Sequence, residues 1–292
     1  MGLTINIIGT GNLGKTIGRL IVMHHAGVIQ GLVNRTLSHS THALQFIGEG
    51  TVYNNILSLP PADIILITTP DNTISEACLA LCQNKHIKPG CIVIHCSGSL
   101  TSEVLLPLKQ RGCSIASIHP MHSFANPELS VKQYAGTFCA VEGDKEATQI
   151  VTQLFQSIGS ITYFIHKDKK QLYHAAGVFA CNYLVTLSQQ SLSCLQDAGV
   201  EQEMAMKIIV NLMKSTVFNL EKTMSPEKSL TGPIQRGDTV TIQHHLNALD
   251  SPIQKALYSL LGQATVGLTR HNNENLDALN RTFRTPKSIF LN

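Results

Sequence analysis

The sequence predicts an α/β fold in which a doubly wound Rossmann sheet is followed by an all-α C-terminal domain. Short apolar segments alternate with amphipathic helical segments through residues 161–165. Beyond them, apolar residues recur at the helical interval almost to the end of the chain. We therefore expect a first domain over residues 1–166 and a second, helical domain over residues 167–292.

Composition narrows the class of protein. The chain has 292 residues, 43% of them hydrophobic, and a net charge of only +3 without a basic run. Disorder is excluded, and neither a nucleic-acid groove nor an anionic membrane is favoured as a partner. With no signal sequence and no long apolar run we expect a cytosolic protein. None of its eight cysteines forms a C-x-x-C pair, and Cys78 and Cys82 suit buried thiols better than metal ligands.

The first strand leads into a glycine-rich turn. Apolar residues 5–8 are followed by Gly9-x-Gly11-x-x-Gly14 and then by an amphipathic helix. Gly9 permits a sharp turn, Gly11 lets backbone approach a pyrophosphate, and Gly14 lets the helix pack on the strand. The free N–H groups at the helix N-terminus favour phosphate. A plain glycine-rich turn is the alternative. The predicted dinucleotide contacts are Gly9, Gly11, Asn12, Leu13 and Gly14.

The second strand, residues 28–33, ends in Asn34-Arg35-Thr36-Leu37-Ser38. An NAD site has an acidic residue near this point for the ribose 2′-hydroxyl, but the first acidic residue of this chain is Glu49. Arg35 with its hydroxyl neighbours instead suits a 2′-phosphate, so we expect NADP to be bound with help from Asn34, Arg35 and Thr36. The alternative is that Arg35 is simply a solvated turn residue.

The third strand, residues 64–68, is apolar throughout and ends in Thr69-Pro70. The carboxyl ends of parallel strands form the ligand-binding edge of such a sheet, so we expect Thr69 and Pro70 to contact the cofactor. Thr73-x-x-Glu76 has the form of a capping box and predicts that a helix begins there.

Two further strand ends hold candidate catalytic residues. Ser97 follows the strand 91–95, and His119 follows the strand 114–118. An imidazole and a hydroxyl beside a nicotinamide can hold and protonate a carbonyl oxygen, so His119 is the predicted catalytic residue and Ser97 its helper. The alternative is that these histidines bond loop backbone, which we favour for His95 and His122. A metal site at His119 and His122 is disfavoured because no acidic or thiol partner is spaced to complete it.

The remaining segments predict two more strands, 138–141 and 161–165, and then helices over 172–195, 201–220, 239–249 and 253–269. The turn 230–238 contains Gly232-Pro233 and Arg236. It suggests a loop over the active site in which Arg236 binds an anionic group. An ordinary turn with Asp238 capping the next helix is compatible with the same residues.

Several motifs together carry a family resemblance. They are the glycine turn, Ile118-His119-Pro120-Met121, Tyr173-His174-Ala175-Ala176 with Asn182-Tyr183-Leu184, and Leu230-Thr231-Gly232-Pro233 with Arg236-Gly237-Asp238. With them the chain resembles the 6-phosphogluconate dehydrogenase-like superfamily, which includes ketopantoate reductase, pyrroline carboxylate reductase and prephenate dehydrogenase. Within it, the chain looks like a bacterial family of Rossmann-like NADP oxidoreductases whose helical C-terminal domain has no assigned function.

The resemblance implies roles for single residues. His119 is placed like the histidine that contacts the reacting oxygen in prephenate dehydrogenases, and Ser97 like their active-site serine. Asn182 is placed like the helix asparagine of ketopantoate reductase. Those reductases carry a catalytic lysine one helical turn earlier, where this chain has Val178. Proton transfer therefore falls to His119 or His174, or does not occur.

We accordingly expect an NADP-dependent reductase of a small carboxylate-bearing carbonyl compound, a 2-oxo acid such as ketopantoate being the first choice by analogy. Asn182 would orient the substrate, while Arg236 and His174 would bind it. The alternatives are a non-catalytic NADP-binding sensor or partner protein, motivated by Val178, and a prephenate dehydrogenase-like oxidative enzyme. The apolar helices predict a homodimer through the second domain.

Overall fold

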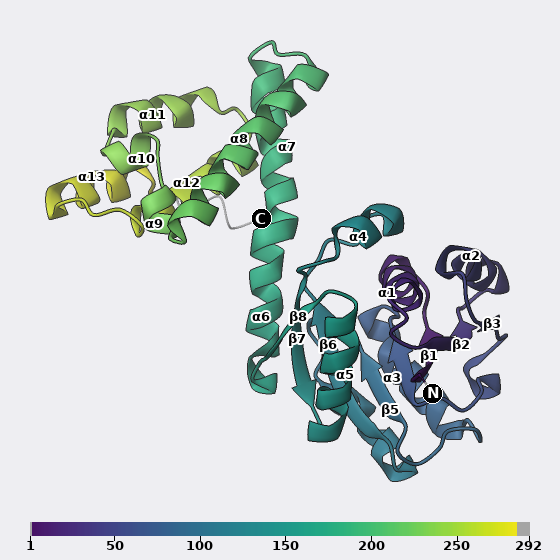
Figure 1. Ribbon diagram of the computed structural model, residues 1–292. Coiled ribbons are helices and arrows are strands. Elements are labelled where there is room, and N and C mark those ends of the chain that lie inside the picture. Colours follow the sequence, from purple (N-terminus) through teal and green to yellow (C-terminus); the bar gives the residue numbers. More distant parts are fainter. Residues whose placement is uncertain (1, 285–292) are drawn as a thin grey trace. The chain divides into compact units, whose positions relative to one another are not determined.

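The computed structural model describes residues 2–284, so residue 1 and residues 285–292 of the two predicted domains lie outside the described residues. The chain divides into two compact units, Met1–Asn182 and Tyr183–Asn292 (Figure 1). This division falls later than the predicted boundary after residue 166. The reason is that the helix beginning at Lys170 buries that lysine against the strands of the first unit.

The first unit is built on an eight-stranded sheet with the strand order β3-β2-β1-β4-β5-β6-β7-β8. All neighbouring strands are parallel except β6 and β7, which pair antiparallel. The strands are β1 (Thr4–Ile8), β2 (Val28–Val33), β3 (Thr51–Val52), β4 (Ile64–Ile67), β5 (Ile92–His95), β6 (Ser114–Pro120), β7 (Phe138–Gly143) and β8 (Ile161–Phe164).

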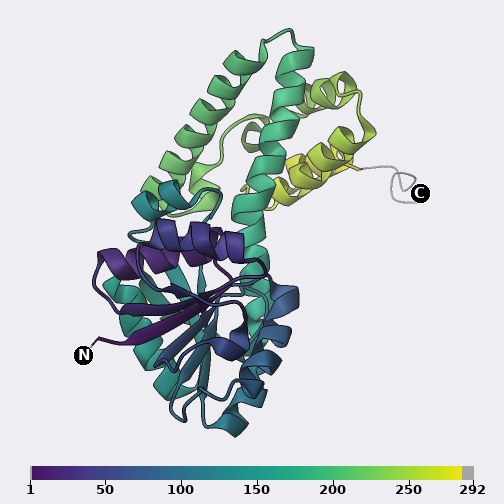
Figure 2. The same ribbon diagram turned by 90° about the vertical axis from the view of Figure 1, so that its right-hand side faces the viewer.

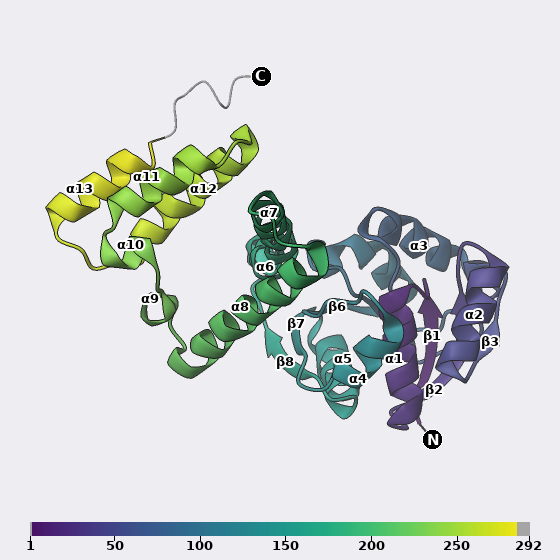
Figure 3. The same cartoon turned by 90° about the horizontal axis from the view of Figure 1, so that it is seen from above.

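Helices cover both faces of this sheet, which confirms the doubly wound prediction (Figure 3). One face packs against α1 (Asn12–Met23), α2 (Leu37–Ile47) and α5 (Lys145–Ser157). The other packs against α3 (Asp71–Gln83) and the 3₁₀ helix η2 (Ser102–Arg111). Successive residues of the central strands alternate between the two cores, as a strand period of two requires.

Three local predictions need correction. The helical segment Ser102–Arg111, which should be α-helical in a doubly wound sheet, is a 3₁₀ helix, consistent with Pro107 inside it, which lacks an N–H for an α-helical bond. Helix α3 begins at Asp71 rather than at a Thr73 capping box, because the Thr73 hydroxyl donates to the carbonyl of Pro70. The sequence reasoning also missed α2, α5 and the short α4 (Pro127–Gln133).

Three short elements, η1 (Ile56–Ser58), η3 (Lys167–Lys169) and α6 (Lys170–Gly177), belong to the first unit, and α6 continues into a π-helical segment, Val178–Asn182. The second unit is helical, as predicted, and its long helices α7 and α8 pack side by side (Figure 2). Its helices are α7 (Tyr183–Asp197), α8 (Gln202–Thr223), α9 (Pro226–Ser229), α10 (Pro233–Arg236), α11 (Thr239–Ala248), α12 (Pro252–Val266) and α13 (Asn273–Thr282). Within residues 2–284, no helix combines the length and apolar character needed to cross a bilayer.

Candidate active site

The glycine turn has the predicted geometry. Gly9 adopts a φ of +85°, and a Cβ there would lie 2.5 Å from Thr69 Cγ2. A Cβ on Gly14 would lie 2.4 Å from the Gly9 carbonyl oxygen, whereas one on Gly11 would meet no atom within 4 Å. Gly9 and Gly14 are therefore required by the fold of the turn. Gly11 is not, and the space beside it is open to a ligand.

The N-terminus of α1 fits a phosphate group. Gly11 caps this helix without a side-chain hydrogen bond, and the first turn contains no acidic residue. Its free N–H groups and the positive end of the helix dipole thus face the open side of Gly11. Nearby, the buried hydroxyl of Thr69 has no partner among the described residues. A dinucleotide pyrophosphate matches the free N–H groups of the helix N-terminus.

Two of the predicted cofactor contacts hold the turn in shape. Asn34 accepts from the Thr10 N–H at 3.1 Å and donates to the Thr10 hydroxyl. Asn12 donates to the carbonyl oxygens of Phe124 and Ala125 at 2.8 and 3.0 Å, which ties α1 to the loop after β6. The side-chain amides of Asn34 and Asn12 are thus occupied by the protein itself.

The remaining predicted cofactor residues are Leu13, Arg35, Thr36 and Pro70. Leu13 packs its side chain against the core, so that only its backbone is available to a ligand. Arg35 and Thr36 are exposed beyond the carboxyl end of β2, and Thr36 is the N-cap residue of α2. Pro70 is exposed and is the N-cap residue of α3. Beyond β2 the chain therefore offers the Arg35 cation and the Thr36 hydroxyl to a ligand, and residues 34–38 contain no carboxylate.

Ser97 and His95 form a self-contained turn after β5. The buried His95 accepts from the Ser97 N–H at Nδ1 and contacts the Thr101 carbonyl through Nε2 at 3.1 Å. The Ser97 hydroxyl accepts from the N–H groups of Ser99 and Leu100 at 3.1 and 2.9 Å. Burial lowers the pKa of His95 to about 4, so the ring is neutral at pH 7. The His95 ring and the Ser97 hydroxyl both bond the backbone of this loop, and the role of Ser97 as a helper of His119 stays a prediction.

His119 contacts two residues of α6, Tyr173 and His174, and the three form a cluster. Its Nδ1 lies 2.9 Å from the Tyr173 hydroxyl, and its ring meets that of His174 edge to face at 5.6 Å between centroids. Both histidines lie over Gly98, where a Cβ would be 2.8 Å from His119 Nε2 and 2.3 Å from His174 Nδ1. The absence of a side chain at Gly98 is what lets the two rings lie against this loop.

The surroundings of His119 set its protonation state. Burial, then the neighbouring His174 and Lys170, lower the pKa of His119 to about 4, and Asp71 opposes this shift. At pH 7 the ring is therefore neutral. A neutral ring can hold a substrate oxygen through a hydrogen bond, which is one part of the predicted role, whereas protonating that oxygen would need the imidazolium form.

A buried ion pair between Lys170 and Glu142 connects α6 to β7. Lys170 and Glu142 are 2% and 6% exposed, and Lys170 Nζ lies 3.0 Å from Glu142 Oε1 and also donates to the Ser117 hydroxyl. The Ser102 N–H and hydroxyl donate to the same carboxylate, each at 2.8 Å. Burial lowers the pKa of Lys170, while Glu142 raises it. Every polar atom of the pair thus has a partner inside the protein.

Asn182 lies at the end of the π-helical segment and is exposed. Val178 begins this segment. The position at which the resembled reductases carry a catalytic lysine and the position of Asn182 therefore both lie in it. A π segment adds a residue to the helical turn and changes the direction of the side chains that follow, and such segments are frequent at functional sites.

Arg236 belongs to the second unit and ends the short helix α10. Its side chain is exposed. The turn is fixed by left-handed Gly232 and Gly237, and Asp238 caps α11 by accepting from the Thr241 N–H at 3.0 Å. The predicted cap is therefore confirmed, and the binding of an anion by Arg236 stays a prediction.

The sequence reasoning missed Lys170, Glu142, Tyr173 as a partner of His119, and Asp71. One signal was available: Lys170, Tyr173, His174 and Gly177 are spaced i, i+3, i+4 and i+7, which places them on one helical face. Among the described residues, no group of three or more His, Cys, Asp or Glu side chains is arranged to hold a metal ion.

The sheet and its glycine turn define a Rossmann-type fold. Residues 1–120 match the Rossmann-like domain family, and residues 137–265 match DUF2520, a domain family of unknown function. The two matches lie one after the other along the chain, and they confirm the resemblance to Rossmann-like proteins with a helical C-terminal domain of unassigned function. No curated protein matches the chain.

Solved structures share the fold over nearly the whole chain. Protein BF3122 of Bacteroides fragilis is 19% identical, with a TM-score of 0.75 and coverage of 91% of this chain and 98% of that one. An imine reductase of Myxococcus stipitatus in complex with NADP⁺ is 14% identical, with a TM-score of 0.67 and coverage of 94% and 99%. A pyrroline carboxylate reductase of Plasmodium falciparum with NADP bound is also 14% identical, with a TM-score of 0.58 and coverage of 96% and 95%.

Proposed function

We propose that this protein is an NADP-dependent oxidoreductase of a small, carboxylate-bearing compound. The observation that carries the proposal is the open α1 N-terminus at Gly11, with Arg35 in place of an acidic residue beyond β2. Two proteins of the same fold, the imine reductase and the pyrroline carboxylate reductase, are described with NADP bound, which supports this choice.

The bound cofactor would supply a hydride from its nicotinamide ring. The chain's own residues would do the rest: α1 holds the pyrophosphate, and Arg35 with Thr36 holds the 2′-phosphate. His119 and His174, over Gly98, would hold the reacting group, and Asn182 would orient it. Arg236 would bind the carboxylate. A 2-oxo acid such as ketopantoate is the first carbonyl substrate to try.

The proposal is tested by titrating the purified protein with NADPH and NADH and following the fluorescence of the bound nucleotide. We expect tight, selective binding of NADPH, and we expect Arg35→Ala to weaken NADPH binding about tenfold while leaving NADH binding unchanged. Equal affinities for both nucleotides in the unaltered protein would remove the assigned role of Arg35. Failure to bind either one would refute the proposal.

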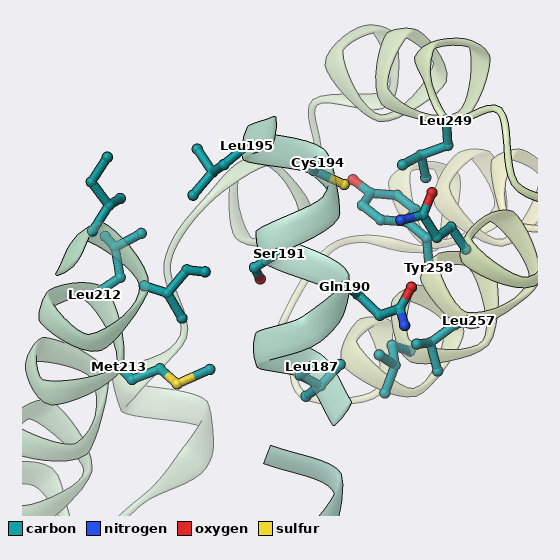
Figure 4. Close-up of a pocket in the computed structure, with 14 residues that line it drawn as sticks. Leu187, Gln190, Ser191, Cys194, Leu195, Leu212, Met213, Leu249, Leu257 and Tyr258 are labelled. Carbon is teal, nitrogen blue, oxygen red and sulfur yellow. The ribbon is translucent and has the colours of Figure 1, made fainter. Parts of the chain in front are cut away.

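We also propose that the second unit mediates homodimer formation. Helix α7 buries none of its residues, and Leu212, Val217 and Phe218 on α8 are 55–61% exposed. An apolar cavity of about 550 Å³ opens between α7, α8 and α12, and leucine side chains from these helices point into it (Figure 4). A second copy of the chain would cover these side chains.

Light scattering on a sizing column tests the dimer. Leu212→Glu should give a monomer, because Leu212 lines the cavity and is exposed. Val240→Glu, which adds the same charge at a 65% exposed site on α11, should leave the dimer intact. A monomeric unaltered protein would refute this proposal without affecting the cofactor proposal.

A further inference from the structure

The hydrogen bonds around His119 determine what its free nitrogen offers to a substrate. The Tyr173 hydroxyl lies 2.9 Å from His119 Nδ1 and 3.4 Å from the His119 carbonyl oxygen. Tyr173 has one hydrogen to donate. Both contacts are satisfied together only if Nδ1–H donates to the phenol oxygen and the phenol donates to the carbonyl. In that arrangement Nε2 carries a lone pair, so His119 presents a hydrogen-bond acceptor beside Gly98.

Neither residue of this pair is a proton donor near neutral pH. Burial is the main reason that the pKa of His119 falls to about 4. Burial is also the main reason that the pKa of Tyr173 rises above its usual range. Reduction of a carbonyl group needs a proton for the new alkoxide oxygen. Neither His119 nor Tyr173 provides one, so a 2-oxo acid would need His174 as its proton donor.

A carboxylate stands near the same loop. Asp71, the first residue of α3, accepts a hydrogen bond from the Ser99 hydroxyl at 2.6 Å. Its negative charge raises the pKa values of His119, His95 and Lys170, so its field reaches this cluster. An acceptor and a carboxylate together favour a group that carries both a hydrogen and a positive charge.

We infer that the reacting group of the substrate is a protonated C=N, an iminium, whose N–H donates to His119 Nε2 and whose charge faces Asp71. This inference rests on the proposed NADP-dependent function and specifies its substrate class. A cyclic imine that bears a carboxylate is the nitrogen counterpart of the 2-oxo acid. The pyrroline carboxylate reductase and the imine reductase of the same fold are likewise named for C=N compounds.

The reaction balances without a proton donor. NADPH is the reductant: the hydride forms a new C–H bond at the iminium carbon, and the π electron pair of C=N becomes the lone pair of the amine nitrogen. The iminium charge is neutralised, and NADPH becomes NADP⁺. The N–H hydrogen stays on nitrogen throughout, so His119 needs only to accept its hydrogen bond and Asp71 only to stabilise the charge of the substrate.

The tautomer of His119 can be measured without any cofactor or turnover. In ¹⁵N-histidine-labelled protein at pH 7, with the resonance assigned by its loss in His119→Gln, Nδ1 should be protonated and Nε2 bare. A protonated Nε2 in the unaltered protein would overturn the inference, because the site would then offer a donor where an iminium needs an acceptor.

Turnover separates the two substrate classes. With NADPH, 1-pyrroline-2-carboxylate should be reduced at least tenfold faster than ketopantoate or pyruvate. Asp71→Asn should lower kcat/KM for the imine about tenfold, the loss expected for one charge-assisted contact. Glu76→Gln, which removes an exposed charge from the same helix, should leave it unchanged.

The outcomes distinguish this inference from the proposed function. Consumption of NADPH with the 2-oxo acids but not with the imine would overturn the C=N assignment and leave the NADP-dependent oxidoreductase standing. Binding of NADPH without consumption of either class would also overturn it and would favour a non-catalytic NADP-binding protein. Absence of NADPH binding would refute both.

Discussion

The buried Lys170–Glu142 pair allows a quantitative test of the structure that does not depend on the substrate. Lys170→Met removes the ammonium but keeps an apolar side chain of similar length. Glu142 would keep its two bonds from Ser102 but lose its counter-charge at 6% exposure. Breaking a buried pair from one side costs about 3–5 kcal/mol, so we expect the first unit to lose that much unfolding free energy.

A double-mutant cycle identifies the pairwise part of this loss. Lys170→Met combined with Glu142→Gln leaves no unpaired charge, so the double variant should be destabilised less than the sum of the two single variants, by about 2–3 kcal/mol. The assay is hydrogen exchange of β6 and β7 peptides across a urea series, since these strands report on the first unit alone.

Lys167→Met is the matched control. Lys167 lies three residues earlier and forms an exposed ion pair with Glu103. Its loss should leave the urea midpoint of the first unit within experimental error of the unaltered protein. Two outcomes would show that Lys170 and Glu142 do not form a desolvated pair. One is a Lys170→Met variant with an unchanged urea midpoint. The other is a double variant whose loss of unfolding free energy equals the sum of the two single losses.

Other predictions follow from the glycines and the histidines. Gly11→Ala should fold with little change in stability yet lose NADPH binding, whereas Gly14→Ala, whose Cβ would lie 2.4 Å from backbone, should be strongly destabilised in a melting experiment. The folded pKa of His95, about 4, lies below the value of 6.5 in an unfolded chain, so stability is fully present above pH 6.5 and declines towards pH 4. His95 should contribute about 3 kcal/mol to this decline, and His119 should add a further loss of stability between the same pH values. An unfolding free energy that stayed constant between pH 6.5 and pH 4 would contradict both pKa shifts. Gly98→Ala, with its Cβ 2.3 Å from His174 Nδ1, should displace the rings by about 1 Å and lower turnover about 100-fold while NADPH still binds; unchanged turnover would remove the His119 cluster from the active site.

The parts of the site that sequence reasoning predicted depend on local rules. The glycine turn follows from the spacing of three residues between a strand and a helix. The position of His119 follows from the rule that parallel strands bring their carboxyl ends to one edge. Neither prediction needs knowledge of which distant residues meet.

The parts it missed depend on long-range register. Glu142 meets Lys170 because β7 runs antiparallel to β6 and pairs Glu142 with Ser117. The sequence pattern gave the strand 138–141 no direction, so it could not place these residues together. The residue types at Asn34 and Ser97 were equally uninformative, because an amide or hydroxyl at a strand end bonds its own turn as readily as a ligand.

The chemistry available at His119 follows from the order of the effects that act on it. Burial ranks first, and the neighbouring His174 and Lys170 act in the same direction, while Asp71 alone among the principal effects opposes them. Removal of the charge of Lys170 would therefore raise the pKa of His119 but would leave the larger effect of burial in place. A ring kept neutral mainly by burial is a stable hydrogen-bond partner and a weak acid. It suits a substrate that arrives with its own proton better than one that must be given one.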